Sequence, residues 1–442
     1  MRHGADSAAA ANAADAAIGA AQRVAVVGAG WAGLAAAVRS VQAGHQVSLF
    51  EMAPQVGGRA RAVPADEGVP DNGQHILIGA YSRTLALMRD VGADADTLLW
   101  RHPLVLRYPD GRGLALPPGS PLPAFVRAVA TCRGWTWADR IALLTQAGSW
   151  ALRGFRCDPS WTVDRLCRGL PARVRALLID PLCVAALNTP ASQASAAVLL
   201  RVLRDALFSG PGSADLLLPR APLAALLPEP ATAWLQQRGA RLHLGRRVQA
   251  IQPRPGGGWD VDGEPFDRVV LACTATEAAR LAAALAPAWS ARAAALRYEP
   301  IITAYVHWPG ARLPAPMTAL IEGDDAPAQF AFDHGAIGAT PGLFALVVSG
   351  ARPWVERGRE ATAVAVLRQC RACMSAPGDS AGPQLLRLLT EKRATFRCAP
   401  GLDRPPAQIL PGLVAAGDYV QGPYPATLEG AVRAGEAAAA LS

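Results

Sequence analysis

Three glycines near the N-terminal end of the chain have the spacing of a turn that binds phosphate groups. They follow residues 24–27, a run of Val and Ala that predicts a buried parallel strand. In such a turn the first glycine permits a tight bend, the second lets the backbone approach a pyrophosphate, and the third lets the next helix lie close to the sheet. The first turn of that helix presents free N–H groups to the phosphates. The positions that we expect to form this dinucleotide site are Gly28, Gly30, Trp31, Ala32 and Gly33.

A carboxylate follows where the ribose of a dinucleotide would lie. The helix predicted over residues 34–43 ends at Gly44, and residues 46–50 predict a second strand with Glu51 at its end. A carboxylate at this place can accept hydrogen bonds from a ribose 2′-hydroxyl, and it would repel a 2′-phosphate. An ordinary strand, turn and helix with three glycines is the alternative, but it leaves Glu51 unexplained.

A second glycine pair favours FAD over NAD. The stretch from Glu51 to Arg61, which contains Gly57, Gly58 and Arg59, resembles the flavoprotein amine oxidase and carotenoid desaturase superfamily. The resemblance implies that Gly58 lets the backbone approach the FAD pyrophosphate and that Arg59 adds positive charge beside it, with Arg61 as the second candidate. A glycine-rich loop with two solvated arginines is the alternative.

The C-terminal part of the chain contains a matching motif. Residues 413–418 form a short apolar stretch that ends in Gly417 and Asp418, and a helix of small residues follows. This pattern resembles the C-terminal FAD motif of the same superfamily. The resemblance implies that Asp418 binds hydroxyls of the ribityl chain or of the pyrophosphate side. It also implies that a helix starting near Gly430, with Ala431 in its first turn, points its positive end at the flavin. A terminal helix packed by alanines is the alternative.

A third segment lies between these motifs. Residues 241–251 predict a strand, a turn and a second strand, residues 259–267 predict a hairpin, and residues 268–274 predict a buried strand. By the resemblance, the backbone of Val248 contacts the adenine, and the chain returns to the nucleotide domain over residues 271–274.

Length and composition fit an enzyme with two intertwined domains, because 442 residues exceed one typical hydrophobic core. We expect an α/β fold in which an FAD-binding, Rossmann-like domain of the GR2 type is interleaved with an α+β substrate domain, made of a helical insertion and a sheet. The nucleotide domain is predicted to comprise residues 23–105, 240–275 and 405–442, and the substrate domain residues 106–239 and 276–404. Residues 1–22 are expected to be a disordered leader.

Charge, cysteines and hydropathy narrow the possible partners. The net charge of +8 favours an anionic membrane surface or nucleic acid, but no basic run is interleaved with aromatic residues, so nucleic acid is not expected. Eight scattered cysteines without a secretory signal favour reduced thiols in the cytoplasm. Cys370 and Cys373 have no histidines nearby, so we expect no metal site. No run of about 18 strongly apolar residues predicts a membrane-spanning helix. The expected location is the cytoplasm, with peripheral contact to the inner face of the membrane.

Four stretches are similar to one family within the superfamily, the bacterial hydroxysqualene dehydroxylases. They are residues 71–81 (Asp-Asn-Gly-Gln-His at their start), 180–190 (Leu-Asn-Thr-Pro at their end), 200–208 and 215–220. The resemblance implies replacement of the hydroxyl of hydroxysqualene, a hydrophobic C30 isoprenoid, by a hydride from reduced flavin, giving squalene in hopanoid biosynthesis.

Loss of the hydroxyl requires a proton donor or strong hydrogen bonds, because hydroxide is a poor leaving group. We expect His75 or Asp71 to supply them, with Gln74 beside them on the segment that approaches the flavin by the resemblance. The alternative is that Asp71 starts a turn and that His75 satisfies backbone groups. Further pocket candidates are Asn188, Tyr419 and Tyr424.

The substrate domain is predicted to begin with helices over residues 135–155 and 191–208. One face of the helix over residues 191–208 is apolar. Such a face is typical of the hydrophobic core, and it is also compatible with a tunnel lining or with a surface that rests on a membrane. Its residues are Leu199, Leu200, Leu203, Leu207 and Phe208. Four tryptophans fit either a membrane interface or the interior. They are Trp135, Trp137, Trp150 and Trp161. Strands are predicted over residues 301–308, 329–332 and 343–348, under the substrate site.

Three other functions fit parts of the pattern. A desaturase-like enzyme of the same fold would oxidise a carotenoid or phytoene polyene, and an amine oxidase would need a ring-facing aromatic pair that is not evident. A non-catalytic escort protein for lipids or prenyl groups would lose flavin contacts, but Gly33, Glu51, Arg59 and Asp418 are all present. The lack of a second nucleotide fingerprint favours a separate electron donor, such as a ferredoxin or a flavin reductase.

Overall fold

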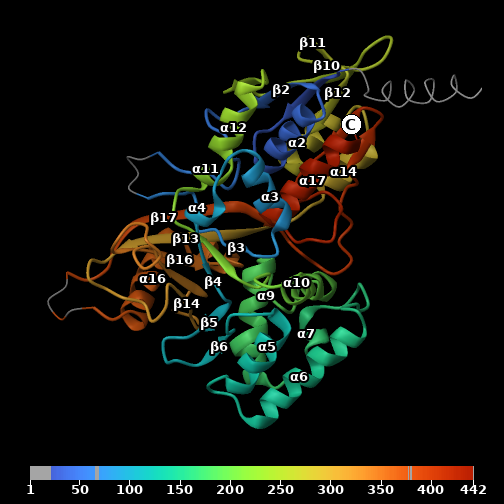
Figure 1. The fold of residues 1–442 in the computed structure, drawn as a ribbon. Helices are drawn as coiled ribbons and strands as arrows, with labels where there is room; N and C mark the ends of the chain where they lie inside the picture. Colours follow the sequence, from blue (N-terminus) through green and yellow to red (C-terminus); the bar gives the residue numbers. More distant parts are fainter. Residues whose placement is uncertain (1–20, 65–68, 377, 379–380, 442) are drawn as a thin grey trace, which may run out of the picture.

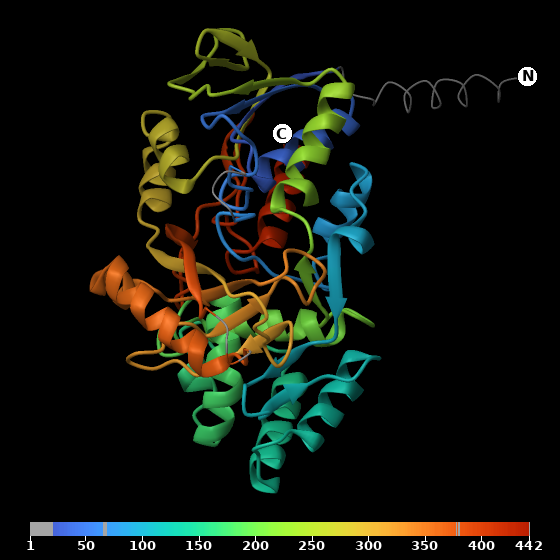
Figure 2. The same ribbon diagram turned by 90° about the vertical axis from the view of Figure 1, so that its left-hand side faces the viewer.

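The computed structural model describes residues 21–64, 69–376, 378 and 381–441. The predicted leader over residues 1–22 lies outside this range except for its last two residues. Three regions make up the molecule (Figures 1 and 2). A parallel sheet with its covering helices forms one end, a group of helices forms the opposite end, and an antiparallel sheet lies beside the junction.

The parallel sheet has six strands in the order β18-β19-β12-β1-β2-β8. All neighbours are parallel except β18 and β19. In the register, Val24 lies between Arg268 on one side and Val47 on the other. The inner strands are apolar runs because both faces of the sheet are covered. The strands are β1 (Arg23–Val27), β2 (Gln46–Glu51), β8 (Arg241–Leu244), β12 (Arg268–Leu271), β18 (Gln408–Leu410) and β19 (Leu413–Ala415).

Alternate residues of this sheet face two separate cores, as the two-residue period of a strand requires. Val24 and Val26 belong to one core, and Ala25 and Val27 to the other. The helices on the first side are α2 (Trp31–Gln42), α12 (Pro228–Gln237) and α17 (Leu428–Leu441), and those on the second are α13 (Ala275–Ala282) and α14 (Pro287–Ala294). The residues of α12 were predicted to lie in the substrate half, but α12 shares this core with α2 and α17.

The first and last helices of the described chain pack directly on each other. A Cβ atom on Gly435 of α17 would overlap the carbonyl oxygen of Ala32 in α2. An ion pair of 2.6 Å between Arg39 and Glu436 lies along the same contact. Two helices that lie far apart in the sequence are therefore joined beside the glycine turn, which precedes α2.

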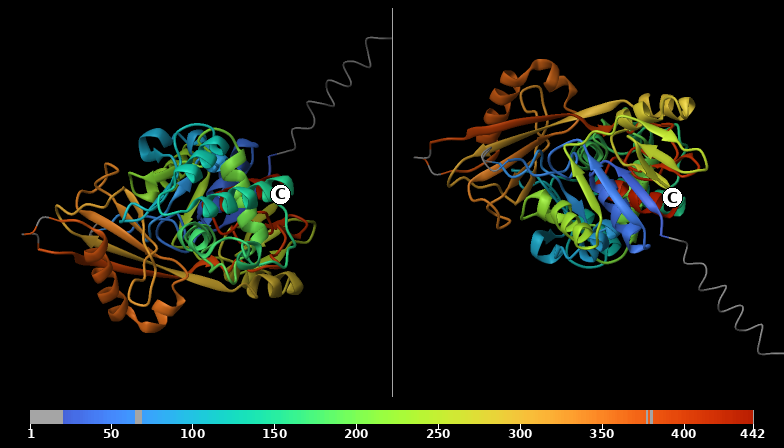
Figure 3. Two further views of the ribbon diagram at one scale, coloured as in Figure 1. Left: turned by 90° about the horizontal axis from the view of Figure 1, so that it is seen from below. Right: turned by 90° about the horizontal axis from the view of Figure 1, so that it is seen from above.

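The antiparallel sheet has the order β14-β15-β16-β13-β17 and projects to one side of the molecule (Figure 3). Helices α15 (Arg352–Arg357) and α16 (Arg359–Cys373) form a core with one of its faces. The strands are β13 (Tyr298–His307), β14 (Met317–Ala319), β15 (Phe330–Asp333), β16 (Leu343–Val348) and β17 (Gln384–Phe396).

The helical end of the molecule is formed mainly by residues 121–208. A capping box between Thr136 and Asp139 starts the longest helix of this region, and Asn188 ends another in the left-handed conformation, with φ of 47°. The helices are α5 (Pro121–Thr131), α6 (Trp137–Leu152), α7 (Val163–Leu166), α8 (Ala172–Val174), a π-helical turn (Arg175–Ile179), α9 (Asp180–Leu187) and α10 (Ala196–Phe208).

Short elements connect these regions. One small sheet consists of β3 (Leu77–Ile78), β7 (Leu216–Pro219) and β4 (Leu99–His102), and a second of β9 (Ile251–Pro253), β10 (Trp259–Val261) and β11 (Glu264–Phe266). Strands β5 (Val105–Arg107) and β6 (Gly113–Ala115) form a hairpin. The short helices are α3 (Ser82–Asp90), α4 (Ala95–Leu98) and α11 (Leu223–Leu226).

Most predicted elements are confirmed, with shifted bounds. The mixed α/β class, the hairpin β10–β11 and the three substrate-side strands are present as expected. The first helix was predicted from residue 34, but it begins at Trp31 because the turn leads straight into it. Of the strand, turn and second strand predicted over residues 241–251, the first strand is present as β8, but pairing in the second starts only at Ile251. Among the helices of the described residues, none combines the length and apolar character that crossing a bilayer requires.

Candidate flavin and substrate site

The glycine turn after β1 leaves space that only glycines permit. Gly28 has φ of +110°, and a Cβ atom there would lie 2.7 Å from the backbone of Ala272. A Cβ atom on Gly33 would overlap the carbonyl oxygen of Gly28. The backbone of Gly30 pairs with that of Gly57, so the two glycine-rich loops lie side by side. Because α2 has no side-chain cap and no acidic residue in its first turn, its N–H groups are available to an anion.

Glu51 holds this turn in place from the end of β2. Its carboxylate accepts hydrogen bonds from the backbone N–H of Ala29 at 2.8 Å and of Ala53 at 2.9 Å. A carboxylate offers about four acceptor positions, so two remain for ribose hydroxyls. Glu51 is 9% exposed and lines the cavity described below.

Arg59 and Asp418, predicted from opposite ends of the sequence, contact each other. The guanidinium of Arg59 lies 2.6 Å from the Asp418 carboxylate, and it also donates to the carbonyl oxygen of Ala394 at 2.6 Å. Arg61 donates to the carbonyl oxygen of Gly58. The two candidate FAD motifs therefore form one site, with the positive charge of Arg59 already balanced by a carboxylate.

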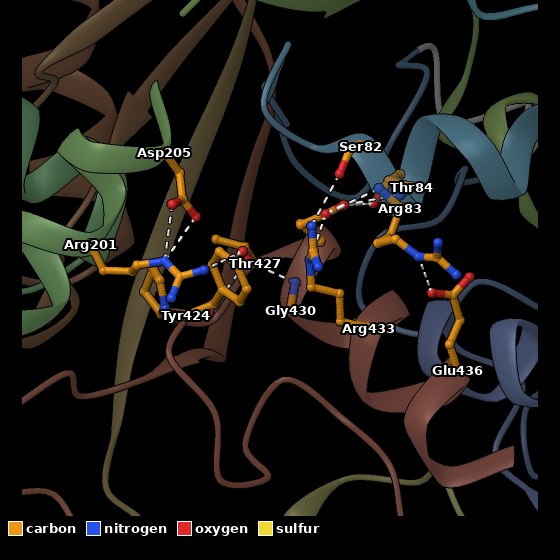
Figure 4. Close-up of polar contacts among 12 residues, drawn as sticks. Ser82, Arg83, Thr84, Arg201, Asp205, Tyr424, Thr427, Gly430, Arg433 and Glu436 are labelled. Atoms are coloured by element: carbon orange, nitrogen blue, oxygen red, sulfur yellow. Dashed lines mark hydrogen bonds and ion pairs between the residues drawn. The ribbon is translucent and has the colours of Figure 1, made fainter. Parts of the chain in front are cut away.

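The C-terminal helix α17 starts beside this pair. It begins at Leu428, two residues before the predicted start, and Thr427 accepts a hydrogen bond of 3.0 Å from the N–H of Gly430. Glu429 is buried and accepts hydrogen bonds from the backbone N–H and the hydroxyl of Thr84, which fixes the helix on α3 (Figure 4). Ala431 faces the cavity in the first turn, where the partial positive charge of a helix N-terminus acts.

Val248 is buried and lines the same cavity. Its carbonyl oxygen accepts a hydrogen bond of 2.7 Å from Arg280. Hydrogen bonds from Arg247 and Arg280 lower the pKa of Glu277 to about 2. These ion pairs fix the segment that carries Val248 at the cavity wall.

These residues fit a dinucleotide such as FAD. The glycine cradle would be filled by any Cβ atom, the uncapped start of α2 suits a pyrophosphate, and Glu51 suits a ribose. The fit rests on the backbone turn and on the donor and acceptor set, both of which belong to the described residues.

A cavity of about 1070 Å³ extends from this cradle into the rest of the molecule, at the upper end of the usual range of about 300–1,000 Å³ for ligand sites. Its far part is apolar, with walls from the antiparallel sheet and from helices α5, α6, α9 and α10. Of the predicted apolar face on α10, Leu203, Leu207 and Phe208 line the cavity, whereas Leu199 and Leu200 belong to the core. Residues from the sheet are Ile301, Met317, Phe330, Phe332 and Val347.

The predicted catalytic residues lie between the two parts of the cavity, but not all of them line it. Gln74 and His75 line the cavity, whereas Asp71 lies behind it and accepts a hydrogen bond of 2.8 Å from the N–H of Leu223. The side-chain amide oxygen of Gln74 lies 3.0 Å from Nε2 of His334, and the backbone N–H of Gln74 donates to the hydroxyl of Thr303 at 3.4 Å. Within the part of the chain that the structure describes, the imidazole of His75 makes no hydrogen bond.

Burial shifts the pKa values of the titratable side chains around Gln74. The pKa of His75 is lowered to about 4 by burial and by the positive charge of Arg59. Burial lowers the pKa of His334 to about 4 as well, and it raises the pKa of Asp71 to about 7. Both histidines are therefore neutral near pH 7, and a neutral imidazole has one N–H donor and one acceptor.

The three further candidates have different surroundings. Asn188 lines the cavity, and its side chain donates to the carbonyl oxygen of Glu299 and to Thr395 and accepts from Gly350. The hydroxyl of Tyr419 is buried and has no partner among the described residues. The hydroxyl of Tyr424 accepts a hydrogen bond of 3.0 Å from Arg201 of α10 (Figure 4).

Sequence reasoning missed His334 and Tyr305, which lie next to the predicted group. Tyr305 is buried, and within the described residues its hydroxyl has no partner. His334 reaches Gln74 across 260 positions of sequence. The two-residue alternation of Ile301, Thr303 and Tyr305 along β13 was the available signal for a polar patch on this face.

Comparison with known proteins agrees with this site. The family model for flavin containing amine oxidoreductase matches residues 31–441. A crystal structure of an oxidoreductase from Methanosarcina mazei has the same fold, with a TM-score of 0.72 and 18% identity over 94% of this chain and 99% of that one. The chain therefore belongs to the flavin-containing amine oxidoreductase family, and it is an FAD-dependent oxidoreductase.

Two relatives place it more narrowly. The hydroxysqualene dehydroxylase of Rhodopseudomonas palustris is 32% identical over 94% of this chain and 97% of its own length. A probable zeta-carotene desaturase of Synechococcus elongatus is 30% identical, but over 56% of each chain. Within the family the chain groups with the hydroxysqualene dehydroxylases, as predicted, and the carotene desaturases are a related group. An escort protein without catalysis is not supported.

Proposed function

We propose that this protein converts hydroxysqualene to squalene, replacing the hydroxyl group by hydrogen. The observation that carries the proposal is the continuity of the cavity, which joins the dinucleotide cradle at Gly28 and Asp418 to an apolar chamber lined by Leu203 and Phe332. A site with these two parts suits a long hydrocarbon whose reacting carbon must meet the cofactor. The relatives named for this activity support the same substrate class.

The reaction breaks one C–O bond and forms one C–H bond. The oxygen leaves with a hydrogen bond from the protein and takes up a proton that comes from solvent, so that water is released. Bound FAD, once reduced by two electrons, supplies the hydride that the carbon requires. Gly58, Arg59, Glu51 and Asp418 hold the dinucleotide. The electrons come from a separate donor, for which a ferredoxin or a flavin reductase is the candidate, and the lack of a second nucleotide fingerprint in the sequence supports this.

We propose that His75 binds the oxygen of the hydroxyl group that leaves. As a neutral imidazole it donates an N–H hydrogen bond to the hydroxyl, which stabilises the negative charge that develops on oxygen. Gln74 stands beside it and is held by His334 and Thr303. Asp71 has a different role in this proposal: its carboxylate fixes the loop through Leu223, because it lies behind the cavity wall.

The apolar chamber protects the reacting carbon. Loss of the hydroxyl beside a double bond generates allylic cation character, and water in the chamber would recapture it. The side chains of Phe330, Phe332 and Met317 exclude water from the sheet side, and Leu203 does so from α10.

The test is a single turnover. Enzyme with bound FAD is reduced under anaerobic conditions in heavy water and mixed with hydroxysqualene. We expect squalene with deuterium at the former carbinol carbon, because the flavin hydride exchanges with solvent. Oxidised enzyme is the control and should give no squalene. Zeta-carotene with oxidised enzyme tests the desaturase alternative. Absence of squalene from the reduced enzyme would refute the proposed function.

A further inference from the structure

Exposed apolar side chains gather on the helices that end the molecule opposite the parallel sheet. Six large apolar residues on α5, α6 and α10 are exposed, and Leu152 is the most exposed, at 92%. Figures 1 and 2 show α5 and α6 at the far end of the molecule. We call this surface the apolar rim; it consists of Leu122, Val126, Trp137, Ile141, Leu152 and Phe208.

The cavity reaches this rim. Leu122, Val126 and Phe208 line the cavity and are 44%, 45% and 48% exposed, a surface that includes the part facing the cavity. Ile141 and Leu152 are exposed without lining the cavity, so they mark the outer surface of the same helices. The ring of Phe208 meets that of Phe155 edge to face, at 5.2 Å between centroids. The apolar chamber therefore ends at the rim, away from the polar dinucleotide cradle, and an opening there would lead straight into the chamber.

One helix stripe runs from the outer surface into the chamber. Trp137, Ile141, Leu144 and Gly148 follow each other at intervals of three or four residues on α6, so they share one face. The first two are 70% and 61% exposed, and the last two line the cavity. Such a stripe normally packs against a core, but here its outer half is covered by no described residue.

Positive charge surrounds the rim. Residues 121–157 contain five arginines and a single acidic residue, Asp139, which is used in the cap of α6. Arg127, Arg153 and Arg156 are exposed, directly follow apolar residues of the cavity or the rim, and form no ion pair with any described residue. On α10, Arg204 lies one turn before Phe208 and is likewise exposed and unpaired within that part of the chain.

We propose that the apolar rim inserts into the surface of a lipid bilayer with anionic headgroups, and that the hydrocarbon substrate enters the chamber from the membrane without crossing water. The proposal rests on the proposed function, because it requires a membrane-dissolved substrate. Apolar residues with a tryptophan fit the interface, and the arginines complement anionic headgroups. A second copy of the chain fits less well, since two arginine-rich rims would repel each other.

The test is sedimentation of the FAD-loaded protein with vesicles. We expect binding to phosphatidylcholine vesicles that contain phosphatidylglycerol, weaker binding to pure phosphatidylcholine, and loss of binding at high salt. The double variant Ile141→Glu/Leu152→Glu should lower the partition coefficient about tenfold or more, since two anchors are lost. Neither residue lines the cavity. Val364→Glu, exposed on α16 outside the rim, is the matched control and should bind like wild type.

Two further measurements keep this proposal separate from the proposed function. With hydroxysqualene in detergent, the double variant should turn over like wild type, and with hydroxysqualene in vesicles it should be slower. If wild type is inactive in detergent as well, the proposed function fails. If wild type is active but the double variant binds vesicles equally well, the membrane surface is wrong. Light scattering that shows a dimer dissociated by the double variant, without vesicle binding, would also overturn it.

Discussion

Replacing Gly33 by alanine tests whether the first turn of the chain holds the cofactor. The new Cβ atom would overlap the Gly28 carbonyl oxygen and lie 3.0 Å from the Gly28 carbonyl carbon and 3.1 Å from Cβ of Ala272. The optimal separation of such carbon atoms is about 3.5–4.0 Å. The obstructing atoms are backbone, so α2 must move away from the turn. Overpacking of this kind costs about 3 kcal/mol, the upper end of the usual range.

If that cost falls on the bound form, the Kd for FAD rises by about two orders of magnitude, because 1.4 kcal/mol corresponds to a factor of ten. The assay is titration of apoprotein with FAD by flavin fluorescence, together with the thermal unfolding midpoint. Gly323→Ala is the matched control, because a Cβ atom at Gly323 would meet nothing within 4 Å. A Gly33→Ala protein that binds FAD with wild-type affinity would refute the assignment of this turn.

Three other predictions concern the chemistry. The variant His75→Ala should retain FAD and lower the single-turnover rate about 10²–10³-fold, as for loss of a donor to a developing oxyanion. The variant Asp71→Asn should stay within about tenfold of the wild-type rate if Asp71 only positions the loop. Equal losses of rate in both variants would contradict the assigned roles. The pKa of His334 in the folded protein is about 4, below its ordinary value. Its contribution to the free energy of unfolding is therefore complete above about pH 6.5 and is lost as the pH falls toward 4, by about 3 kcal/mol at most. Urea unfolding of His334→Gln should show a smaller loss of this free energy with falling pH, and an unchanged pH dependence would contradict burial of the neutral ring. Asp418→Asn removes the carboxylate that orients Arg59 and that would accept hydrogen bonds from flavin hydroxyls. Flavin affinity should therefore fall at low and at high salt alike, because lost hydrogen bonds are screened little. Retained affinity would contradict a role of Asp418 in holding FAD.

The sequence was most informative where local pattern determines structure. The run from residue 24, the spacing of the glycines and the acid at Glu51 each depend on neighbours in the chain, and the first two strands and the turn are confirmed. The predicted bounds were too wide at both ends of α6 and at the start of α10, because the residues there form loops that apolar content alone cannot distinguish from helix. The resemblance to known flavoproteins added what spacing could not, the partnership of Gly28 with Asp418.

Residues that long-range pairing brings together could not be predicted. His334 meets Gln74 only because β15 and β16 pair, so that the loop after Asp333 returns beside β13 and the segment that follows the glycine loops. No local signal marks a histidine as part of a site 260 positions away. The end of the cavity at the rim had the same origin, since Leu122 and Phe208 become neighbours of one space only when α5 and α10 pack.

The charges of the site favour a neutral His75 as the hydrogen-bond donor to the leaving oxygen. At the cradle, Arg59 is paired with Asp418, so little net charge is added there. At the chamber, His75 is neutral, because burial and Arg59 lower its pKa to about 4. A protonated His75 would place a positive charge beside a carbon that becomes cationic as the hydroxyl leaves, and the like charges would raise the barrier. A neutral N–H donor assists the oxygen without that repulsion. Because Asp71 on the same loop has a pKa of about 7, the rate of dehydroxylation is measured against pH in Asp71→Asn. It should show no inflection near pH 6.5, the ordinary pKa of histidine, and should fall only as the pH approaches 4.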